Sequence, residues 1–302
     1  MVASYGSRDR TTEIVHSFAA CGVRLLDYQE NRGKSATLNA AMTEIETELV
    51  LFSDANTTLE PAAPRRLARW FRRGQIGAVC GRLVLVDPAT GKNVDSLYWR
   101  YETFLKRCEA RLGALLGANG AIYAIRRQSY VPIPTETIVD DFVVPLLARL
   151  ATGCRLVYDA DAVAYEQTPA RISDEFRRRV RIGAGGFQSL PLLWPLLSPR
   201  QGWLAVSFFS HKLLRWFSPF CLVAMLVSSL ALAGEPFYRW LLAAQTAFYG
   251  LALLGAQLPG RRRSVRLLRL ATLFSSMNLA LLIGFFRWLT GRQRGAWART
   301  ER

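Results

Sequence analysis

One short stretch of this chain decides its fold, Leu49-Val50-Leu51-Phe52-Ser53-Asp54-Ala55-Asn56. Its apolar first half has the length and composition of a buried strand, and it ends directly in an acid and a polar loop. In parallel α/β sheets, ligands gather at the carboxyl ends of the strands. Asp54 is therefore a candidate ligand or metal residue, and a turn-capping aspartate is the alternative.

Outward from this stretch, residues 1–170 alternate between short apolar runs and amphipathic segments. The predicted strands are residues 2–4, 23–26, 49–53, 78–80, 121–125 and 156–158. The predicted helices are residues 11–20, 36–43, 61–71, 97–112 and 141–150. Such alternation predicts an α/β fold with a mostly parallel, Rossmann-like sheet.

Composition and charge exclude several classes of protein. The 302 residues are 51% hydrophobic, which excludes global disorder. Five scattered cysteines with no C-x-x-C pair exclude a disulfide scaffold and a cysteine-type zinc module. The whole net charge of +16 lies in residues 177–302, where basic residues flank apolar runs. A nucleic-acid binder would show basic residues interleaved with stacking aromatics, whereas these charges flank apolar runs. A nucleic-acid binder is therefore the least favoured class of protein.

Three apolar runs predict about three transmembrane helices. Residues 216–234 and 240–260 carry no charge, and residues 270–286 form a shorter third run. A bilayer core needs about 20 apolar residues in a helix, and core helices of a soluble protein would show polar faces. Residues 189–210, which contain Trp194 and Trp203, predict an interfacial helix. We therefore expect a catalytic domain over 1–175, a basic and interfacial region over 176–210, and a membrane region over 211–302.

The arginines indicate an orientation in the cell membrane. Basic residues precede the first span and fill the loop 261–269, which predicts a cytoplasmic catalytic domain in a multi-pass protein. The basic tail after the third span also favours the cytoplasm, whereas three full crossings would place it outside. These two patterns leave undecided on which side of the membrane the tail lies.

Further candidate motifs flank the central stretch. Gly33-Lys34-Ser35 is not a P-loop, because Tyr28 stands where the Walker pattern needs glycine. Asp140 and Asp141 begin a predicted helix. Either they only cap this helix, or they raise each other's pKa, so that one of the two carboxylates can act as a general base. The basic run 177–181 is a solvated or lipid-contacting face, or a diphosphate clamp.

Taken in order, these motifs resemble glycosyltransferase family 2, the inverting nucleotide-sugar transferases that include membrane polysaccharide synthases. The segments that carry the resemblance are Ser7-Arg8-Asp9-Arg10-Thr11, Gly33-Lys34-Ser35-Ala36-Thr37-Leu38-Asn39, Asp54-Ala55-Asn56, Gly117-Ala118-Asn119-Gly120-Ala121, Asp140-Asp141 and Arg178-Arg179-Val180-Arg181-Ile182. The resemblance implies a glycosyltransferase A-type fold and an inverting transfer from a nucleotide sugar, a UDP-sugar above all. The implied acceptor is a saccharide or a lipid-linked saccharide, and membrane lipids are further partners.

The resemblance also assigns roles. It implies that Asp141 is the catalytic base and that Asp54 and Asn56 bind Mg²⁺ or Mn²⁺. The implied donor-binding residues are Lys34, Asp54, Asn56, Arg178 and Arg181. The implied acceptor-binding residues are Asn119, Gly120 and Asp140.

Two departures from the family pattern limit these roles. Only Arg181 remains of the family's Q-x-x-R-W, so processive synthesis and transfer of one sugar stay equally open. The family's opening strand and helix have no counterpart before Val2-Ala3-Ser4, which predicts an N-terminally shortened form that binds nucleotide sugar poorly. A membrane-anchored pseudoenzyme or assembly subunit is therefore the alternative.

Overall fold

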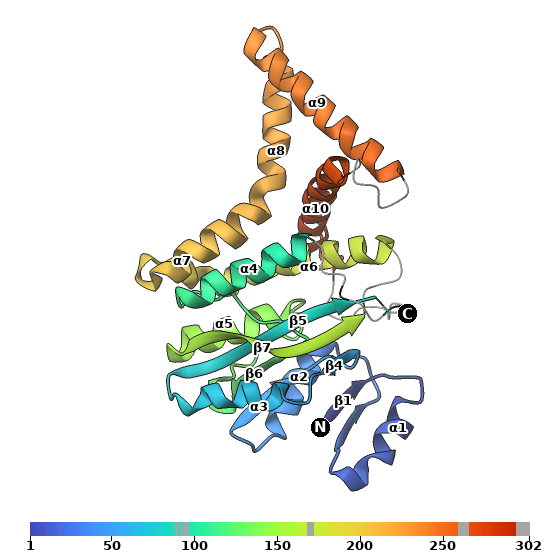
Figure 1. The fold of residues 1–302 in the computed structure, drawn as a ribbon, viewed down its shortest axis with the longest axis vertical. Coiled ribbons are helices and arrows are strands. Elements are labelled where there is room, and N and C mark those ends of the chain that lie inside the picture. The colour runs from blue at the N-terminus through green and yellow to red at the C-terminus, as the bar shows by residue number, and fades with distance from the viewer. Residues whose placement is uncertain (88–89, 91–92, 94–96, 168–171, 259–265, 294–302) are drawn as a thin grey trace. The chain divides into compact units, whose positions relative to one another are not determined.

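A computed structural model describes residues 1–302 except 88–89, 91–92, 94–96, 168–171, 259–265 and 294–302 (Figure 1). The chain forms two compact units. Of the described residues, unit 1 comprises those within Met1–Ala170 and Gln188–Phe209, and unit 2 comprises those within Arg171–Phe187 and Ser210–Gln293. The prediction of orientation in the membrane used the arginines at 261–263, 294, 299 and 302, which lie outside the described residues.

Unit 1 is built on two sheets. The larger sheet has the strand order β3-β6-β5-β7-β4, and β1 and β2 form a separate parallel pair (Figure 1). The strands are β1 Val2–Tyr5, β2 Leu25–Tyr28, β3 Leu49–Phe52, β4 Thr57–Leu59, β5 Ile76–Val86, β6 Tyr123–Arg126 and β7 Arg155–Gln167. All the predicted strands are present, and each begins within two residues of its predicted start. Strand β4 and the long extensions of β5 and β7 were not predicted.

The prediction of a mostly parallel sheet is wrong, because the larger sheet is mixed. Strand β6 runs antiparallel to both of its neighbours, β3 and β5, and β4 runs antiparallel to β7. Only β5 and β7 are parallel within this sheet. Alternation of strands and helices along a chain leaves strand direction undetermined, because a helix can also connect two antiparallel strands.

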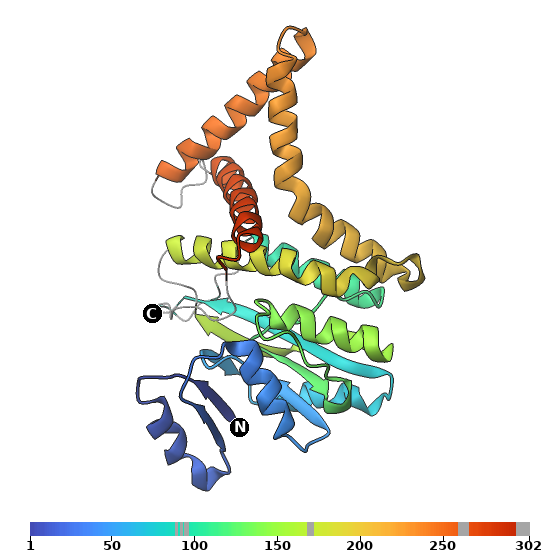
Figure 2. The same ribbon diagram turned by 180° about the vertical axis from the view of Figure 1, so that it is seen from behind.

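Helices cover both faces of the larger sheet (Figures 1 and 2). On one face, α3 (Ala63–Ala68) and the 3-10 turn Arg69–Arg72 bury a core against the strands. That core comprises Ala63, Leu67, Phe71, Ile76, Val79, Ile122, Ala124, Ala162 and Ala164. On the other face, α5 (Asp140–Thr152) buries Val143, Val144, Leu146 and Ala148.

The remaining helices of unit 1 position its loops. They are α1 (Thr11–Ser17), α2 (Lys34–Thr43), α4 (Leu97–Arg111) and α7 (Trp203–Ser207), with 3-10 turns at Ala19–Cys21, Arg127–Ser129, Trp194–Leu197 and Pro199–Gln201. Helix α6 (Ile172–Leu193) contributes its last residues to unit 1 and the rest to unit 2.

Unit 2 is a set of long apolar helices, α8 (Leu214–Ala231), α9 (Pro236–Gln257) and α10 (Arg266–Leu289), preceded by a π-helical stretch at Phe208–Leu213. Small residues let these helices approach closely. A Cβ on Gly284 would lie 2.7 Å from the carbonyl oxygen of Val180, and one on Gly255 would lie 2.8 Å from that of Leu268. Such contacts between glycines and backbone are typical of helix packing in membranes.

Two helical segments among the described residues are long and apolar enough to cross a bilayer. They are Trp203–Ala231 and Leu268–Leu289, with mean hydropathies of 1.7 and 1.5. Only 17% and 22% of their most apolar windows are buried, so most of their apolar surface is uncovered. Helix α9 does not belong to this pair, and the predicted number of three spans remains a prediction.

Candidate active site

Antiparallel pairing brings two predicted site segments together. Phe52 at the end of β3 pairs with Tyr123 at the start of β6, and their rings stack at 4.7 Å. The residue that follows β3 by two positions therefore lies beside the loop that precedes β6. That loop holds Gly120, and a Cβ built on it would lie 3.4 Å from Asp54 Oδ2.

The same glycine approaches a second carboxylate. The backbone N–H of Gly120 donates a hydrogen bond of 3.0 Å to Asp141 Oδ2, and its ideal Cβ position lies 3.4 Å from that oxygen. Asp54 and Asp141 thus converge on one small space that the missing side chain of Gly120 leaves open. The backbone fixes Asp141 further, because its carbonyl accepts a hydrogen bond of 2.9 Å from Ala118 N–H.

Lys34 neutralises part of this acidic cluster. Its ammonium lies 2.9 Å from Asp54 Oδ1 and 3.2 Å from Asp140 Oδ2. Gly33 starts α2 with a φ of 80°, a conformation that favours glycine, and so directs Lys34 into the site. Burial lowers the pKa of Lys34, but Asp140 and Asp54 together outweigh this effect and raise it, so the ammonium stays charged.

Asp140 is almost fully buried beside these charges. Burial raises the pKa of its carboxyl, Lys34 lowers it, and the negative charges of Asp141 and Asp54 raise it again, with a net increase. The lysine therefore offsets only part of the increase in this pKa that burial and the two neighbouring carboxylates produce.

Residues outside the acidic cluster of Asp54, Asp140 and Asp141 hold the loop before β6 in place. Asn119 is buried, its amide nitrogen donates to the carbonyl of Gly81 at 2.7 Å, and its amide oxygen accepts from Lys106. Lys106 also donates to the carbonyl of Ala118 at 3.3 Å. Both polar groups of Asn119 therefore hold the loop, while its predicted contact with an acceptor stays a prediction.

Asn56, the second residue predicted to bind the metal, contacts β7. Its amide nitrogen donates a hydrogen bond of 2.9 Å to Glu166 Oε1, and Glu166 is buried. This leaves the amide oxygen of Asn56 as the atom that it can offer to a cation. No group of three or more histidine, cysteine or acidic side chains within the described residues is arranged to hold a metal ion.

The two predicted diphosphate ligands belong to unit 2. Arg178 approaches Glu175 at 3.9 Å in the first turns of α6, and Arg181 follows three residues later on the same helix. The structure does not bring these arginines together with the cluster around Asp54 within one unit. Their part in donor binding therefore stays a prediction.

Sequence reasoning missed three side chains that support the site. Ser35 donates to the carbonyl of Thr137 at 2.7 Å and thereby ties α2 to the segment before α5. Asn39 binds both backbone groups of Ile133. Gln188 accepts from Ile138 N–H at 3.0 Å. Asn39 stands in the motif quoted above, whereas a single glutamine 50 residues away carries no sequence signal.

The open space at Gly120 leads to a prediction. In Gly120→Ala the new methyl group would contact both Asp54 and Asp141, so we expect the rate of the catalysed reaction to fall about 10- to 100-fold. A rate assay on the variant measures this. Gly74→Ala is the matched control, because a Cβ there meets nothing within 4 Å. An unchanged rate in Gly120→Ala would show that the space plays no part.

Residues 2–131 match the family model described as glycosyl transferase family 2. They belong to that family. The match confirms the family, and the enzyme class of the domain, that the motifs predict. It ends before Asp140 and Asp141, so their roles stay predictions.

Curated relatives of this glycosyltransferase domain are polysaccharide synthases. The chain is 25% identical over 209 residues to the poly-β-1,6-N-acetyl-D-glucosamine synthase of Staphylococcus epidermidis, covering 67% of this chain and 50% of that protein. It is 26% identical over 197 residues to the synthase of the same name from Staphylococcus aureus strain COL, covering 63% and 48%. The chain thus spans about half the length of the curated relatives it matches.

A solved structure shows the same fold. A mannosyltransferase from Pyrobaculum calidifontis, determined in complex with GDP-mannose and Mn²⁺, superposes with a TM-score of 0.69 at 21% identity, over 96% of this chain and 77% of that one. This likeness confirms a glycosyltransferase A-type fold, with the mixed sheet described above in place of the parallel one predicted.

Proposed function

We propose that this chain is a membrane-bound inverting glycosyltransferase that transfers a sugar from a nucleotide-sugar donor to a saccharide or lipid-linked acceptor. Cell-envelope or exopolysaccharide synthesis is the process it would serve. The observation that carries the proposal is the convergence of Asp54 and Asp141 on the open space at Gly120. One carboxylate can face the donor's diphosphate while the other faces the acceptor.

Asp141 is the proposed general base. It takes the proton from the acceptor hydroxyl as that oxygen attacks the anomeric carbon, and the bond from this carbon to the diphosphate oxygen breaks. The nucleoside diphosphate leaves on the opposite face, so the anomeric configuration inverts. The hydrogen bond from Gly120 N–H to Asp141 Oδ2 orients the carboxylate at the open space.

Asp54 is the proposed ligand of a divalent cation. Mg²⁺ is often held by one or two carboxylates together with substrate phosphates, and Asp54 Oδ2 faces the open space while Oδ1 binds Lys34. The residues therefore fit Mg²⁺ or Mn²⁺, with the amide oxygen of Asn56 as a weaker neutral ligand. When bound, the ion would offset negative charge on the leaving diphosphate.

The nature of the donor is proposed from relatives. The curated relatives are named for a polymer of N-acetylglucosamine, and the mannosyltransferase of like fold was solved with GDP-mannose. We infer a nucleotide sugar for this chain and favour a UDP-sugar. Lys34, Arg178 and Arg181 are the proposed cationic contacts to its diphosphate.

Membrane location is supported by the exposed surface of unit 2. Its side chains include Leu230, Phe237, Trp240 and Leu253, each at least 66% exposed. Within the same unit, Gln245 donates a buried hydrogen bond of 2.9 Å to Ser229, which joins α8 and α9. Apolar side chains outside and a polar contact inside are the arrangement that a bilayer favours.

The metal proposal makes a prediction. Asp54→Ala is expected to weaken binding of nucleotide sugar in Mg²⁺ or Mn²⁺ and to make an added chelator irrelevant, because Asp54 is the acid that would hold the ion. Titration of the donor with and without chelator measures both effects. Equal activity of the unaltered protein in chelator and in metal would contradict metal dependence.

Release of nucleoside diphosphate from a panel of nucleotide sugars tests the function as a whole. Membranes that contain the full chain are compared with membranes that contain Asp141→Asn. We expect one class of donor to be consumed in an acceptor-dependent way by the unaltered chain alone. Equal, background release by both would favour the pseudoenzyme or assembly subunit instead.

A further inference from the structure

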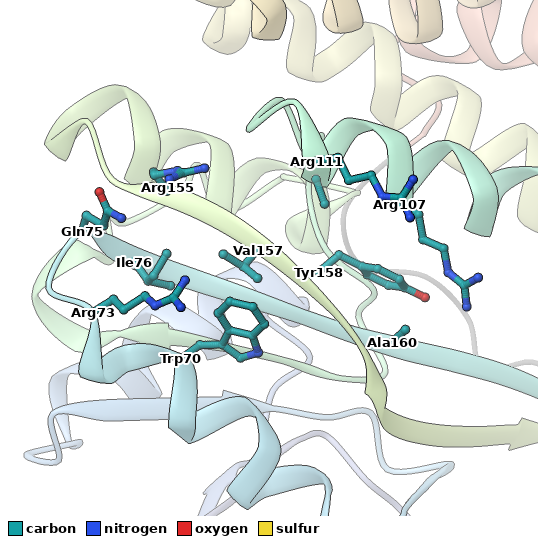
Figure 3. A pocket seen from close by; sticks show the side chains of 11 residues that line it. Trp70, Arg73, Gln75, Ile76, Arg107, Arg111, Arg155, Val157, Tyr158 and Ala160 are labelled. Atoms are coloured by element: carbon teal, nitrogen blue, oxygen red, sulfur yellow. The ribbon is translucent and has the colours of Figure 1, made fainter.

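A cavity of unit 1, apart from the candidate active site, lies between β5, β7, α4 and the turn after α3 (Figure 3). Its volume is about 400 Å³. The residues that give it its chemistry are Trp70, Arg73, Arg107, Arg111, Arg155 and Tyr158. None of them belongs to the cluster around Asp54, and neither the motifs nor the proposed mechanism uses them.

The four guanidinium groups have no acidic counterpart in the described structure. Within the described residues, none of the four forms an ion pair. The nearby carboxylate of Asp159 is already engaged, because it accepts hydrogen bonds from Arg69 at 2.9 Å and from the indole N–H of Trp70 at 2.8 Å. The cavity therefore holds uncompensated positive charge in a form that matches carboxylate and phosphate oxygens.

The cavity also offers a rigid aromatic wall. The hydrogen bond to Asp159 fixes the indole of Trp70, and the guanidinium of Arg73 lies 5.5 Å from its ring centre. Burial raises the pKa of Tyr158 to about 12, and the charge of Arg107 opposes this rise only in part. The phenol thus stays a neutral hydrogen-bond donor at physiological pH. The hydroxyl of Tyr158 suits the hydroxyl groups of a sugar, and the indole of Trp70 holds the guanidinium of Arg73 at the cavity wall.

We propose that this cavity binds an anionic saccharide, a sugar chain that carries carboxylate or phosphate groups. The requirement for negative charge comes from the arginines alone. The choice of a saccharide rests on the proposed function, in which a saccharide is a proposed acceptor.

Helix α4 connects this cavity to the candidate active site. Lys106 holds the loop that contains Asn119, and the next residue, Arg107, lines the cavity. The same helix thus presents one basic residue to the predicted acceptor loop and the following one to the anionic site. We infer that the cavity holds a part of the acceptor or product chain away from the reacting end.

Calorimetric titration of the full chain in detergent tests the proposal. The probes are an oligogalacturonate, which carries a carboxylate on each sugar, and maltotriose, which is neutral. We expect the oligogalacturonate to bind at least about tenfold more tightly, because charge-assisted hydrogen bonds are the stronger class. Equal affinity for both probes would overturn the proposal.

Variants locate the binding. The double variant Arg107→Gln with Arg155→Gln is expected to lose at least about tenfold in affinity for the oligogalacturonate. Arg65→Gln with Arg72→Gln is the matched control, because it also removes two positive charges and both residues are exposed and do not line the cavity. Loss in the control equal to that in the double variant would show general attraction to positive charge and would contradict a site here.

Two further probes separate the classes of ligand. Mixed micelles of phosphatidylglycerol in the same detergent, and a single-stranded RNA, are titrated against the same proteins. Tighter, Arg107- and Arg155-dependent binding of either would show that the cavity serves a lipid or a nucleic acid. Donor turnover on the same preparations reports the proposed function separately. If donor turnover is absent while the oligogalacturonate still binds, the proposed transferase function is refuted and the anionic saccharide site remains supported.

Discussion

Asp141→Asn is expected to lower the rate of sugar transfer by about 10²- to 10⁴-fold, the range that removal of a general base produces. The amide keeps the size of the side chain and still accepts the hydrogen bond from Gly120 N–H. It cannot take a proton from the acceptor hydroxyl. Measurement of the transfer rate at saturating donor and acceptor gives the loss directly.

Two comparisons check this assignment. Binding of the nucleotide sugar to Asp141→Asn should stay close to that of the unaltered chain, because the base acts on the acceptor. Asp140→Asn should be the milder change for the chemical step, because Asp140 is buried against Lys34. A severe loss in Asp140→Asn together with a mild one in Asp141→Asn would reverse the assignment within the pair.

Lys34→Met is expected to have the second large effect, a loss of at least about 30-fold in donor affinity. Removing one partner of a buried hydrogen-bonded charge pair costs about 2–5 kcal/mol. Here it also leaves Asp54 and Asp140 without their shared cation, in a site that must accept a diphosphate. Titration of nucleotide sugar against the variant measures the loss.

The pH profile distinguishes this electrostatic role from loss of packing. Lys34 lowers the pKa of Asp140, so its removal raises that pKa further and Asp140 takes up a proton at a higher pH. The midpoint of Asp140 protonation, followed by NMR of the labelled carboxyl group, should therefore move to higher pH in Lys34→Met. In Lys34→Arg, which keeps the charge, this midpoint should stay near its original position. An unmoved midpoint in Lys34→Met would contradict the role of this charge.

The sequence allowed prediction of the helices and strands, because they depend on local patterns, whereas the roles of the site residues stay predictions. The apolar run before Asp54 forms β3, and Asp140 and Asp141 open α5 as expected. The direction of β6 was not predictable from local pattern. Yet that antiparallel pairing is what places Gly120 beside Asp54.

Contacts between distant residues account for most of what was missed. Glu166, which holds Asn56, lies 110 residues further along the chain. Lys106 has no motif of its own, and its role appears only when α4 lies beside the loop that contains Asn119. The arginines of the cavity in Figure 3 come from α4, β7 and the turn after α3, and no spacing in the sequence relates them.

The configuration of the transferred sugar tests the central claim most directly. The full chain is supplied with nucleotide sugar and acceptor, and the anomeric configuration of the first product is determined by NMR before it can equilibrate. If Asp141 deprotonates an acceptor that attacks opposite the leaving diphosphate, the product has the configuration inverted from that of the donor. A product that retains the donor's configuration would contradict the mechanism proposed for Asp54, Asp141 and Gly120.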